Sequence, residues 1–403
     1  MLKGMKRTLL AALAVVLLTT GCWNRRELNE LAIVVGLAID RGSGEGVRVS
    51  AQVVEPTQVA TGRSAAGGGS RSPVTTYSVE GTTVFEAIRK LTTMSPRILY
   101  LSHLRIVVFG EELAKEGIAE ELEFLSRDHQ VRSDFFIIVA KGEDGREVLN
   151  QLTPLVKNPS QNLFSSLETS ERAWAPTHGA LLDELIDTLV SKGRQPVLTG
   201  IRIVGDKAQG ETQKNVETIE SPARLRYDSL AVFRGDKLAG WLTSKESKGW
   251  NYITDQVQST VGPVPCPDGG EISIEIIRSH ARIKADVRGG RPALKVSVSA
   301  EGNIGEVRCG LDINNPDNIP KVEKAAERKI IEAMDASVKR AQEFKADIFG
   351  FGDALHRAAP DFWKKESKHW GERFATLPVD VHAHVTIRRT GTTNKSYLQD
   401  LED

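Results

Sequence analysis

Apolar and polar residues alternate most clearly in the last third of the chain. Apolar side chains occupy every second position in residues 272–276, 281–287 and 294–300, and again in residues 379–387. Alternation of this kind is typical of a strand that buries one face and exposes the other. The pattern therefore predicts a sheet with one apolar face, which we expect to be antiparallel.

Between these strands, the spacing of the apolar residues changes to that of a helix. The residues of this stripe are Val322, Ala326, Ile330, Met334, Val338, Ala341, Phe344 and Ile348. Their spacing is closer to the about 3.6 residues per turn of a straight helix than to the about 3.5 of a coiled coil. Asn318 and Pro320 indicate the start of the helix, and Gly350 indicates its end. We expect one long helix that covers the apolar face of the sheet.

Residues 22–197 mix strand-like and helix-like patterns. The expected strands are residues 31–39, 47–54, 104–109 and 134–140. One expected helix begins at Thr83, and three further helices are expected at residues 111–126, 144–152 and 177–191. The continuous apolar runs IVVF and FFIIVA are typical of strands buried on both faces. Thr83 and Glu86 have the spacing of a helix capping box. The sequence thus predicts a multidomain α+β protein, with a mixed α/β N-terminal region followed by the sheet and its long helix.

The remaining segments set the expected domain boundaries. Residues 61–73 are read as a Gly/Ser-rich insertion, since nothing in them can bury apolar area against the loss of conformational entropy. A hairpin pattern around Arg234–Lys237 lies in a middle region, and its status as a small second domain or as part of a neighbour stays open. The expected division is a signal peptide (1–21), an N-terminal domain (22–197), the middle region (198–264), a C-terminal domain (265–393) and a tail (394–403).

The first residues have the order of a secretory signal. Three basic side chains within the first seven residues precede an apolar run at residues 9–18, and Cys22 follows it. The run is far shorter than the roughly 20 residues of a membrane-spanning helix, so we expect cleavage. The stretch resembles the lipobox of bacterial lipoproteins, although Thr19 stands where an aliphatic residue is usual. We expect Cys22 to carry a diacylglyceryl group and to begin the mature chain; the alternative is plain secretion, with Cys22 merely close to the cut.

The charge balance changes once this leader is set aside. The whole chain has 53 Lys and Arg against 53 Asp and Glu, and three of the basic residues lie in residues 1–21. The mature chain is therefore slightly acidic, without the basic excess of a nucleic-acid-binding protein or of a polybasic second membrane anchor. Membrane contact is expected from the lipid on Cys22, because two acyl chains hold a protein at a bilayer where one barely does.

Two cysteines, Cys266 and Cys309, remain after lipidation. They flank the predicted strand region, and an extracytoplasmic compartment permits a disulfide between them. The sequence leaves open whether they pair or stay free.

No motif in the sequence indicates catalysis, a metal or a cofactor. The spacings of zinc proteases, Cys-x-x-Cys sites, serine hydrolases, P-loops and EF-hands do not occur. His382 and His384 share one face of a predicted strand, but no third ligand can be assigned to them. We interpret them as polar residues on the solvent face.

Segments spread over the whole mature chain resemble one family in the same order. The chain is similar to the Ger(x)C spore germination lipoproteins in residues 21–40, 101–132, 230–247, 272–276 and 341–364. These proteins are the C subunits of GerA-type nutrient germinant receptors of endospore-forming bacteria. The resemblance implies a multidomain fold of α and β elements, with no catalytic residues and no cofactor, and with Cys22 as the lipidated residue.

The resemblance also implies a function and a location. It implies a lipid-anchored subunit on the extracytoplasmic face of the spore inner membrane, needed for germination in response to nutrients. Its partners would be the integral-membrane A and B subunits, with which it would act by non-catalytic assembly or signal coupling. The alternative is an extracytoplasmic solute-binding lipoprotein, which predicts a ligand cleft between two doubly wound lobes. The predicted C-terminal sheet with one long helix argues against that alternative.

Overall fold

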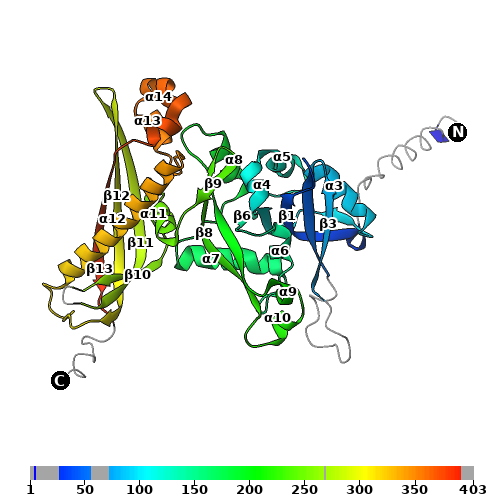
Figure 1. Ribbon diagram of the computed structural model, residues 1–403, viewed down its shortest axis with the longest axis horizontal. Helices are drawn as coiled ribbons and strands as arrows, with labels where there is room; N and C mark the ends of the chain where they lie inside the picture. The colour runs from blue at the N-terminus through cyan, green and yellow to red at the C-terminus, as the bar shows by residue number, and fades with distance from the viewer. Residues whose placement is uncertain (1–3, 6–26, 56–71, 267–268, 392–403) are drawn as a thin grey trace.

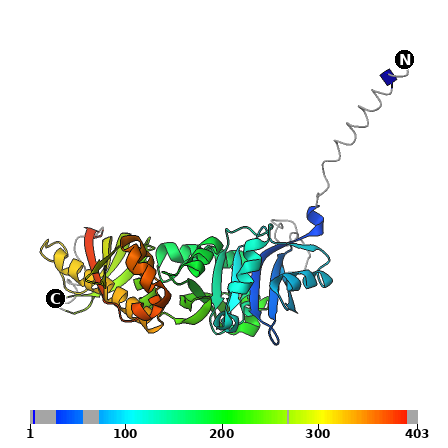
Figure 2. The same cartoon turned by 90° about the horizontal axis from the view of Figure 1, so that it is seen from above.

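Two β-sheets follow one another along the long axis of the molecule (Figures 1 and 2). The computed structural model describes residues 4–5, 27–55, 72–266 and 269–391. The first sheet has nine strands and the second has four. In Figure 1 the first sheet, blue to green, forms one end of the molecule, and the second, yellow to red, forms the other.

The first sheet is mixed. Its strands are β1 (Leu31–Arg41), β2 (Val47–Val54), β3 (Val74–Gly81), β4 (Ile98–Tyr100), β5 (Ile106–Gly110), β6 (Phe136–Ala140), β7 (Val197–Gly205), β8 (Ala223–Arg234) and β9 (Lys237–Trp241). β1, β5, β6 and β7 are parallel neighbours, and β4 pairs in parallel with the start of β1. Antiparallel strands extend the sheet on both sides, β2 and β3 next to β1 and β8 and β9 next to β7.

Helices cover both faces of this sheet because its central strands are apolar on both sides. Val107 and Phe109 of β5 belong to one core, together with α3 (Val84–Lys90), α4 (Glu111–Glu116), α5 (Ala119–Arg127) and α8 (Leu182–Val190). Ile106 and Val108 belong to the opposite core, together with α6 (Gly145–Leu149) and α7 (Pro159–Ala173). This confirms the prediction from the two continuous apolar runs. The other described helices of this part are η1 (Leu28–Glu30), η2 (Leu91–Thr93), α9 (Lys207–Gly210) and α10 (Lys214–Glu217).

The second sheet is covered by one long helix. Its strands are β10 (Thr260–Pro265), β11 (Glu271–Arg288), β12 (Arg291–Arg308) and β13 (Val379–Arg389). The helices of this part are α11 (Ser244–Ile253), α12 (Ile319–Glu343), α13 (Phe351–Ala358), α14 (Pro360–Glu366), η3 (Ser367–His369) and α15 (Trp370–Phe374). Most of the side chains that α12 buries join the core formed by the apolar face of the sheet. The fold class expected from the sequence is therefore confirmed.

The direction of the last strand differs from the expected antiparallel arrangement. β10, β11 and β12 are antiparallel, but β13 runs parallel to β12. The segment from α12 to α15 connects these two strands. A helical crossover of this kind returns the chain to the end of the sheet at which β12 begins, so β13 runs in the same direction as β12. The sheet is therefore mixed at its β13 edge.

Two of the predicted strands are one strand. Residues 272–276 and 281–287 both lie in β11, whose register against β12 shifts between Ile276 and Arg278. A bulge inserts one residue and so moves the apolar positions from even to odd numbers without ending the strand. The change of phase explains why the sequence pattern predicted two strands.

The long helix begins where it was predicted and ends earlier. Asn318 is its N-cap and a proline lies in its first turn, as expected, but the last helical residue is Glu343. Lys345 has a positive φ of 55°, which a continuous helix cannot contain. The apolar stripe nevertheless continues to Ile348, because the turn keeps that side chain in the same core.

The middle region divides between the two sheets. β7, β8 and β9 extend the first sheet, whereas α11 packs beside α12, and β10 forms an edge of the second sheet. Side chains of β7 and β8, among them Val197 and Leu230, lie in the same core as the apolar face of the second sheet. The two sheets are thus joined by a continuous apolar junction.

Candidate functional site

Cys22, the predicted lipidation site, lies outside the described residues, as do most of the leader and most of the Gly/Ser-rich insertion. The described chain resumes at Glu27 and enters η1 and β1. No described helix combines the length and the apolar composition needed to cross a bilayer.

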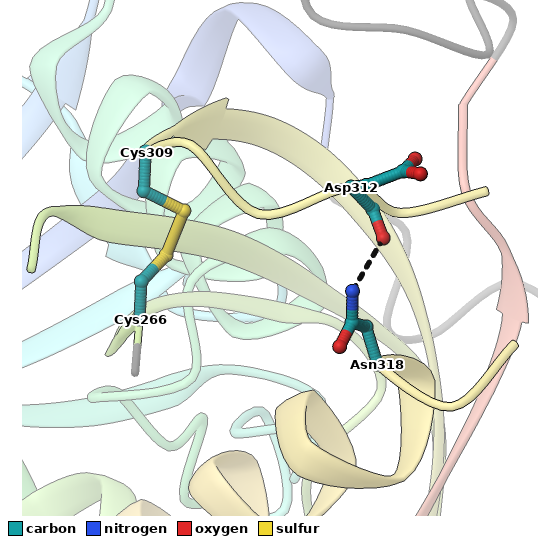
Figure 3. The surroundings of a disulfide bond; sticks show 4 residues. All are labelled: Cys266, Cys309, Asp312 and Asn318. Carbon is teal, nitrogen blue, oxygen red and sulfur yellow. Dashed lines mark hydrogen bonds between the residues drawn. A yellow bond between two sulfur atoms is a disulfide. The ribbon is translucent and has the colours of Figure 1, made fainter. Parts of the chain in front are cut away.

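A disulfide joins Cys266 and Cys309 in the second sheet (Figure 3). Their Cα atoms lie 6.6 Å apart, and 43 positions separate them in the sequence. Cys266 follows β10, and Cys309 follows β12, so the bond ties these two strands together across β11. Next to it, the Asn318 side chain at the start of α12 donates a hydrogen bond to the carbonyl oxygen of Asp312.

The structure does not bring His382 and His384 together on one ligand. His382 Nε2 lies 2.8 Å from an Asp380 carboxylate oxygen, whereas His384 Nδ1 lies 3.0 Å from Glu327 on α12. The described residues contain no group of three or more metal-ligating side chains. Each histidine has a separate acidic neighbour, which fits the interpretation of these residues as surface polar groups.

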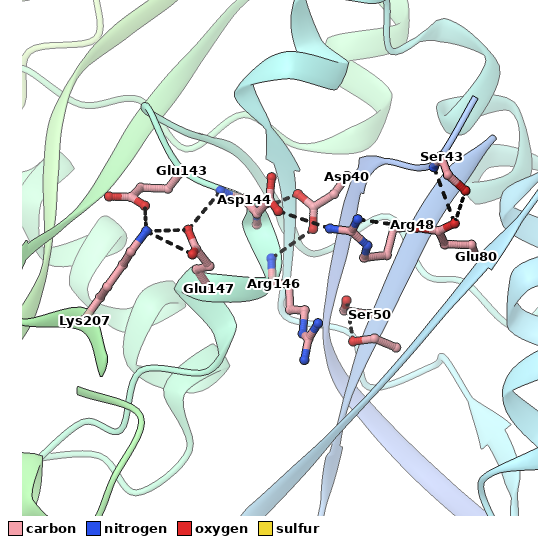
Figure 4. Close-up of polar contacts among 12 residues, drawn as sticks. Asp40, Ser43, Arg48, Ser50, Glu80, Glu143, Asp144, Arg146, Glu147 and Lys207 are labelled. Carbon is pink, nitrogen blue, oxygen red and sulfur yellow. Dashed lines mark hydrogen bonds and ion pairs between the residues drawn. The ribbon is translucent and has the colours of Figure 1, made fainter. Parts of the chain in front are cut away.

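The first buried polar cluster lies where β1 ends (Figure 4). Asp40 accepts hydrogen bonds from the backbone N–H groups of Gly145 (2.6 Å) and Arg146 (3.1 Å) at the start of α6. Burial raises the pKa of Asp40 to about 6, and these hydrogen bonds oppose the effect only in part. Next to it, Arg48 on β2 pairs with Asp144 (3.1 Å) and Glu80 (3.4 Å). The cluster ties α6, β1, β2 and β3 together.

The second cluster places a charged histidine beside the junction. His178, in the loop between α7 and α8, is only 6% exposed, with Glu184 at 3.2 Å and Glu171 at 3.7 Å. Burial acts to lower the pKa of His178, but the two carboxylates outweigh it and raise that pKa to about 9. Its ring also contacts the Trp250 ring of α11, with centroids 5.0 Å apart. The imidazole is thus a buried cation at neutral pH.

The third cluster fixes the turn after α12. Asp347 is buried and accepts hydrogen bonds from four consecutive backbone N–H groups, those of residues 349–352. It also accepts one from the Trp370 indole at 2.8 Å. Burial raises the pKa of Asp347 to about 6 despite these bonds. The Asp347 carboxylate therefore stabilises this turn, and both of its oxygens are occupied by these hydrogen bonds.

Two cavities lie on opposite sides of α11 at the junction. One, of about 360 Å³, is lined by charged and polar residues that include His178, Glu184 and Arg194. The other, of about 370 Å³, is mostly apolar. Trp250 lines the first and Tyr252 the second. α11 therefore forms a wall of both cavities.

The sequence did not indicate these clusters, because no motif or period marks their members. Asp40 meets its backbone partners across 105 and 106 positions, whereas Glu171 and Glu184 lie close to His178 in the chain. Asp40 alone left a signal, since it is a charged residue at the end of the apolar run 31–39. His178 and Asp347 lie outside regular helices and strands, where no periodicity marks a buried position. Their burial becomes visible only when the chain is folded.

Comparisons with known proteins cover nearly the whole chain. Residues 24–203 match the family described as "Spore germination protein N-terminal domain", and residues 228–391 match "Spore germination B3/GerAC like, C-terminal". Spore germination protein KC of Bacillus subtilis (strain 168) is 32% identical over 407 residues, covering 99% of each chain. Spore germination protein B3 of the same organism is 23% identical over 390 residues, covering 93% of this chain and 95% of its own.

A solved structure shares the fold. The crystal structure described as that of the GerBC protein aligns with a TM-score of 0.52 at 19% sequence identity, covering 88% of this chain and 97% of that one. At this identity the likeness shows the fold alone. The family matches to both halves and the full-length similarity to protein KC show more: this chain belongs to the GerAC/GerBC-like C-subunit family of spore germination proteins.

Proposed function

We propose that this chain is the lipid-anchored C subunit of a nutrient germinant receptor and is needed for spores to germinate in response to nutrients. The observation that carries the proposal is the family membership of both halves. The first residues, whose pattern is that of an export leader followed by a lipobox-like cysteine, support it. Its place would be the extracytoplasmic face of the spore inner membrane, held there by the diacylglyceryl group on Cys22.

The mechanism we propose is assembly and signal coupling, without covalent chemistry. Only four residues separate Cys22 from Glu27, a stretch that reaches at most about 17 Å when extended. The lipid would therefore keep the start of β1 close to the bilayer and raise the concentration of the body next to the integral-membrane A and B subunits. The rival function, a solute-binding lipoprotein, would call for a second doubly wound lobe, where this chain has a four-stranded sheet under one long helix.

Deletion of the gene, together with any paralogues, tests the function. Spores without it are expected to lose the germination response to at least one nutrient, while germination that bypasses the receptors stays intact. A normal response to every nutrient would contradict the proposal.

A single substitution tests the anchor separately. Cys22→Ala should abolish labelling of the chain by radioactive fatty acid and release it from the membrane fraction. Cys309→Ala is the matched control and should leave the acyl label unchanged. Labelling that survives Cys22→Ala would place the lipid elsewhere.

A further inference from the structure

The apolar cavity beside α11 has the form of a small-molecule site. It lies between α11, α12 and β10, which are neighbours in Figure 1, and its volume of about 370 Å³ falls within the range of about 300–1,000 Å³ usual for ligand pockets. Its floor consists of buried apolar side chains: Val264, Ile274, Ile276, Ala326 and Ile330.

A glycine opens this cavity. Thr260 and Val264 of β10 are both 3% exposed and so face the interior, and Gly262 lies between them on the same face of the strand. No atom lies within 4 Å of the position that a Cβ on Gly262 would take. The space that a side chain would fill on a regular strand is therefore open.

A lysine without an acidic partner stands at the cavity wall. Lys248 Nζ lies 3.7 Å above the centre of the Trp174 ring and donates one hydrogen bond to the Val261 carbonyl oxygen, at 3.0 Å. An ammonium group has three hydrogens to donate. Burial lowers the pKa of Lys248 to about 8, and no acidic side chain of the described residues forms an ion pair with it.

The rim of the cavity is also positive. Lys245 and Lys329 both reach the same carboxylate, that of Glu332, at 3.5 and 3.8 Å. Glu332 offsets one of these two charges, so with Lys248 the cavity retains an excess of positive charge. An apolar floor under such a rim complements a molecule with an apolar body and a negative head.

We propose that this cavity binds a small amphipathic anion, with its carboxylate or phosphate on Lys248 and its apolar body between β10 and α12. The anion would supply the partner that the partly buried ammonium lacks, while the body fills the space next to Gly262. This site is independent of the lipid anchor and of the proposed receptor role.

Fluorescence titration of the mature chain (residues 22–403, with Cys22→Ser so that no lipid competes) tests the proposal. The probe is 1-anilinonaphthalene-8-sulfonate, itself an amphipathic anion, and the competitors are octanoate, octyl phosphate and octanol. We expect saturable probe binding, displaced by octanoate or octyl phosphate at concentrations at least tenfold below those needed with octanol. The relative potency of the two anions distinguishes a carboxylate ligand from a phosphate ligand.

Two substitutions locate the site by different means. Lys248→Met keeps the length of the side chain but removes the charge, and should weaken the binding of both anions at least tenfold while changing that of octanol less than twofold. Gly262→Leu fills the cavity and should abolish the probe binding that the three competitors can displace. Lys339→Met, on the exposed surface of α12, is the matched control and should bind like the unsubstituted protein.

Two results would overturn the proposal. One is the absence of saturable, anion-displaceable binding in the unsubstituted chain. The other is unchanged binding in Lys248→Met and Gly262→Leu, each checked for folding by near-ultraviolet circular dichroism. Because the two residues lie on different elements, either folded variant decides the question if the other fails to fold.

Discussion

At the scale of single residues, a charged histidine lies between two carboxylates beside the junction of the two sheets. His178 is almost fully buried, whereas its partners Glu171 and Glu184 are partly exposed to solvent. Burial acts to raise the pKa of each carboxyl, but the contact with His178 outweighs it and holds the pKa of both below the usual range. All three groups therefore favour their charged forms in the folded state.

This arrangement predicts a pH dependence of stability. The pKa of His178 is raised from 6.5 to about 9, so its contribution is fully present below pH 6.5 and is lost as the pH rises through about 9. By linkage, the loss amounts to about 3 kcal/mol of unfolding free energy. Urea unfolding of the wild type should show this decline between pH 6.5 and 9, and His178→Gln should lack it. His103→Gln, at an exposed histidine, is the control, and parallel wild-type and His178→Gln curves would contradict the prediction.

Single residues were also where the sequence was least informative. Neither His178 nor Asp347 could be placed inside the protein from its neighbours in the chain, because burial there depends on partners brought together by the fold. Cys22 is predicted as the lipidated residue from a local signal, the residues that precede it, and it lies outside the described residues. Lys248 lies on α11, a helix that the sequence analysis did not predict, and the absence of an ion-pairing carboxylate beside it among the described residues is a property of the packed junction.

At the scale of elements, strand and helix patterns were readable wherever a period persisted. α12 began at the predicted cap because the Asn and Pro signals act locally. The bulge in β11 and the parallel pairing of β13 were not readable, since a phase change resembles a strand break and strand direction depends on the path of the connecting helices. The sequence thus indicates the strongly periodic elements more clearly than the way in which elements pair, and it did not predict α7 or α11, whose apolar spacing is weaker.

The contact between α11 and α12 depends on a glycine. A Cβ at Gly249 would overlap the carbonyl oxygen of Ala333 on α12, a backbone atom that cannot rotate away. Gly249→Ala is therefore expected to lower the free energy of unfolding by about 1–3 kcal/mol, the usual cost of overpacking. Gly262→Ala, where no atom lies within 4 Å, is the control and should change little. Equal unfolding midpoints for the two variants would show that the helices adjust freely.

The disulfide should contribute measurably to the stability of the second sheet. Removal of both sulfurs with Cys266→Ser and Cys309→Ser should lower the unfolding free energy by about 2–4 kcal/mol, as is typical for native bridges. Reduction of the wild type with dithiothreitol should reproduce the shift in guanidinium unfolding. Free thiols at both positions in the unreduced protein, found by peptide mapping, would contradict the bond.

At the scale of the whole molecule, the two sheets share one core at their junction. Val197 and Leu230 from the first sheet belong to the same apolar cluster as Ile272 and Val296 from the second. Asn251 of α11 adds a polar link by donating a hydrogen bond to the Ala175 carbonyl oxygen at 2.9 Å. The expected middle region is divided by this junction rather than standing alone.

This shared core predicts that the two parts open together. Hydrogen exchange followed by mass spectrometry should give the amides of β6 and β12 similar opening free energies, because neither sheet can expose its junction face without the other. Asn251→Ala should reduce both values, whereas the exposed Lys339→Ala should change neither. Exchange of β12 at much lower free energy than β6 would show that the second sheet opens alone.

The disulfide also changes what a protease cut would do to the molecule. Cys266 and Cys309 close a covalent ring that contains β11 and β12 and the turn between them. A peptide bond broken anywhere inside that ring leaves one covalently connected molecule, with the α12 segment still linked to the first sheet. Such a nick separates the chain into two fragments only after reduction, so a protein cleaved in this hairpin would migrate as intact on a non-reducing gel.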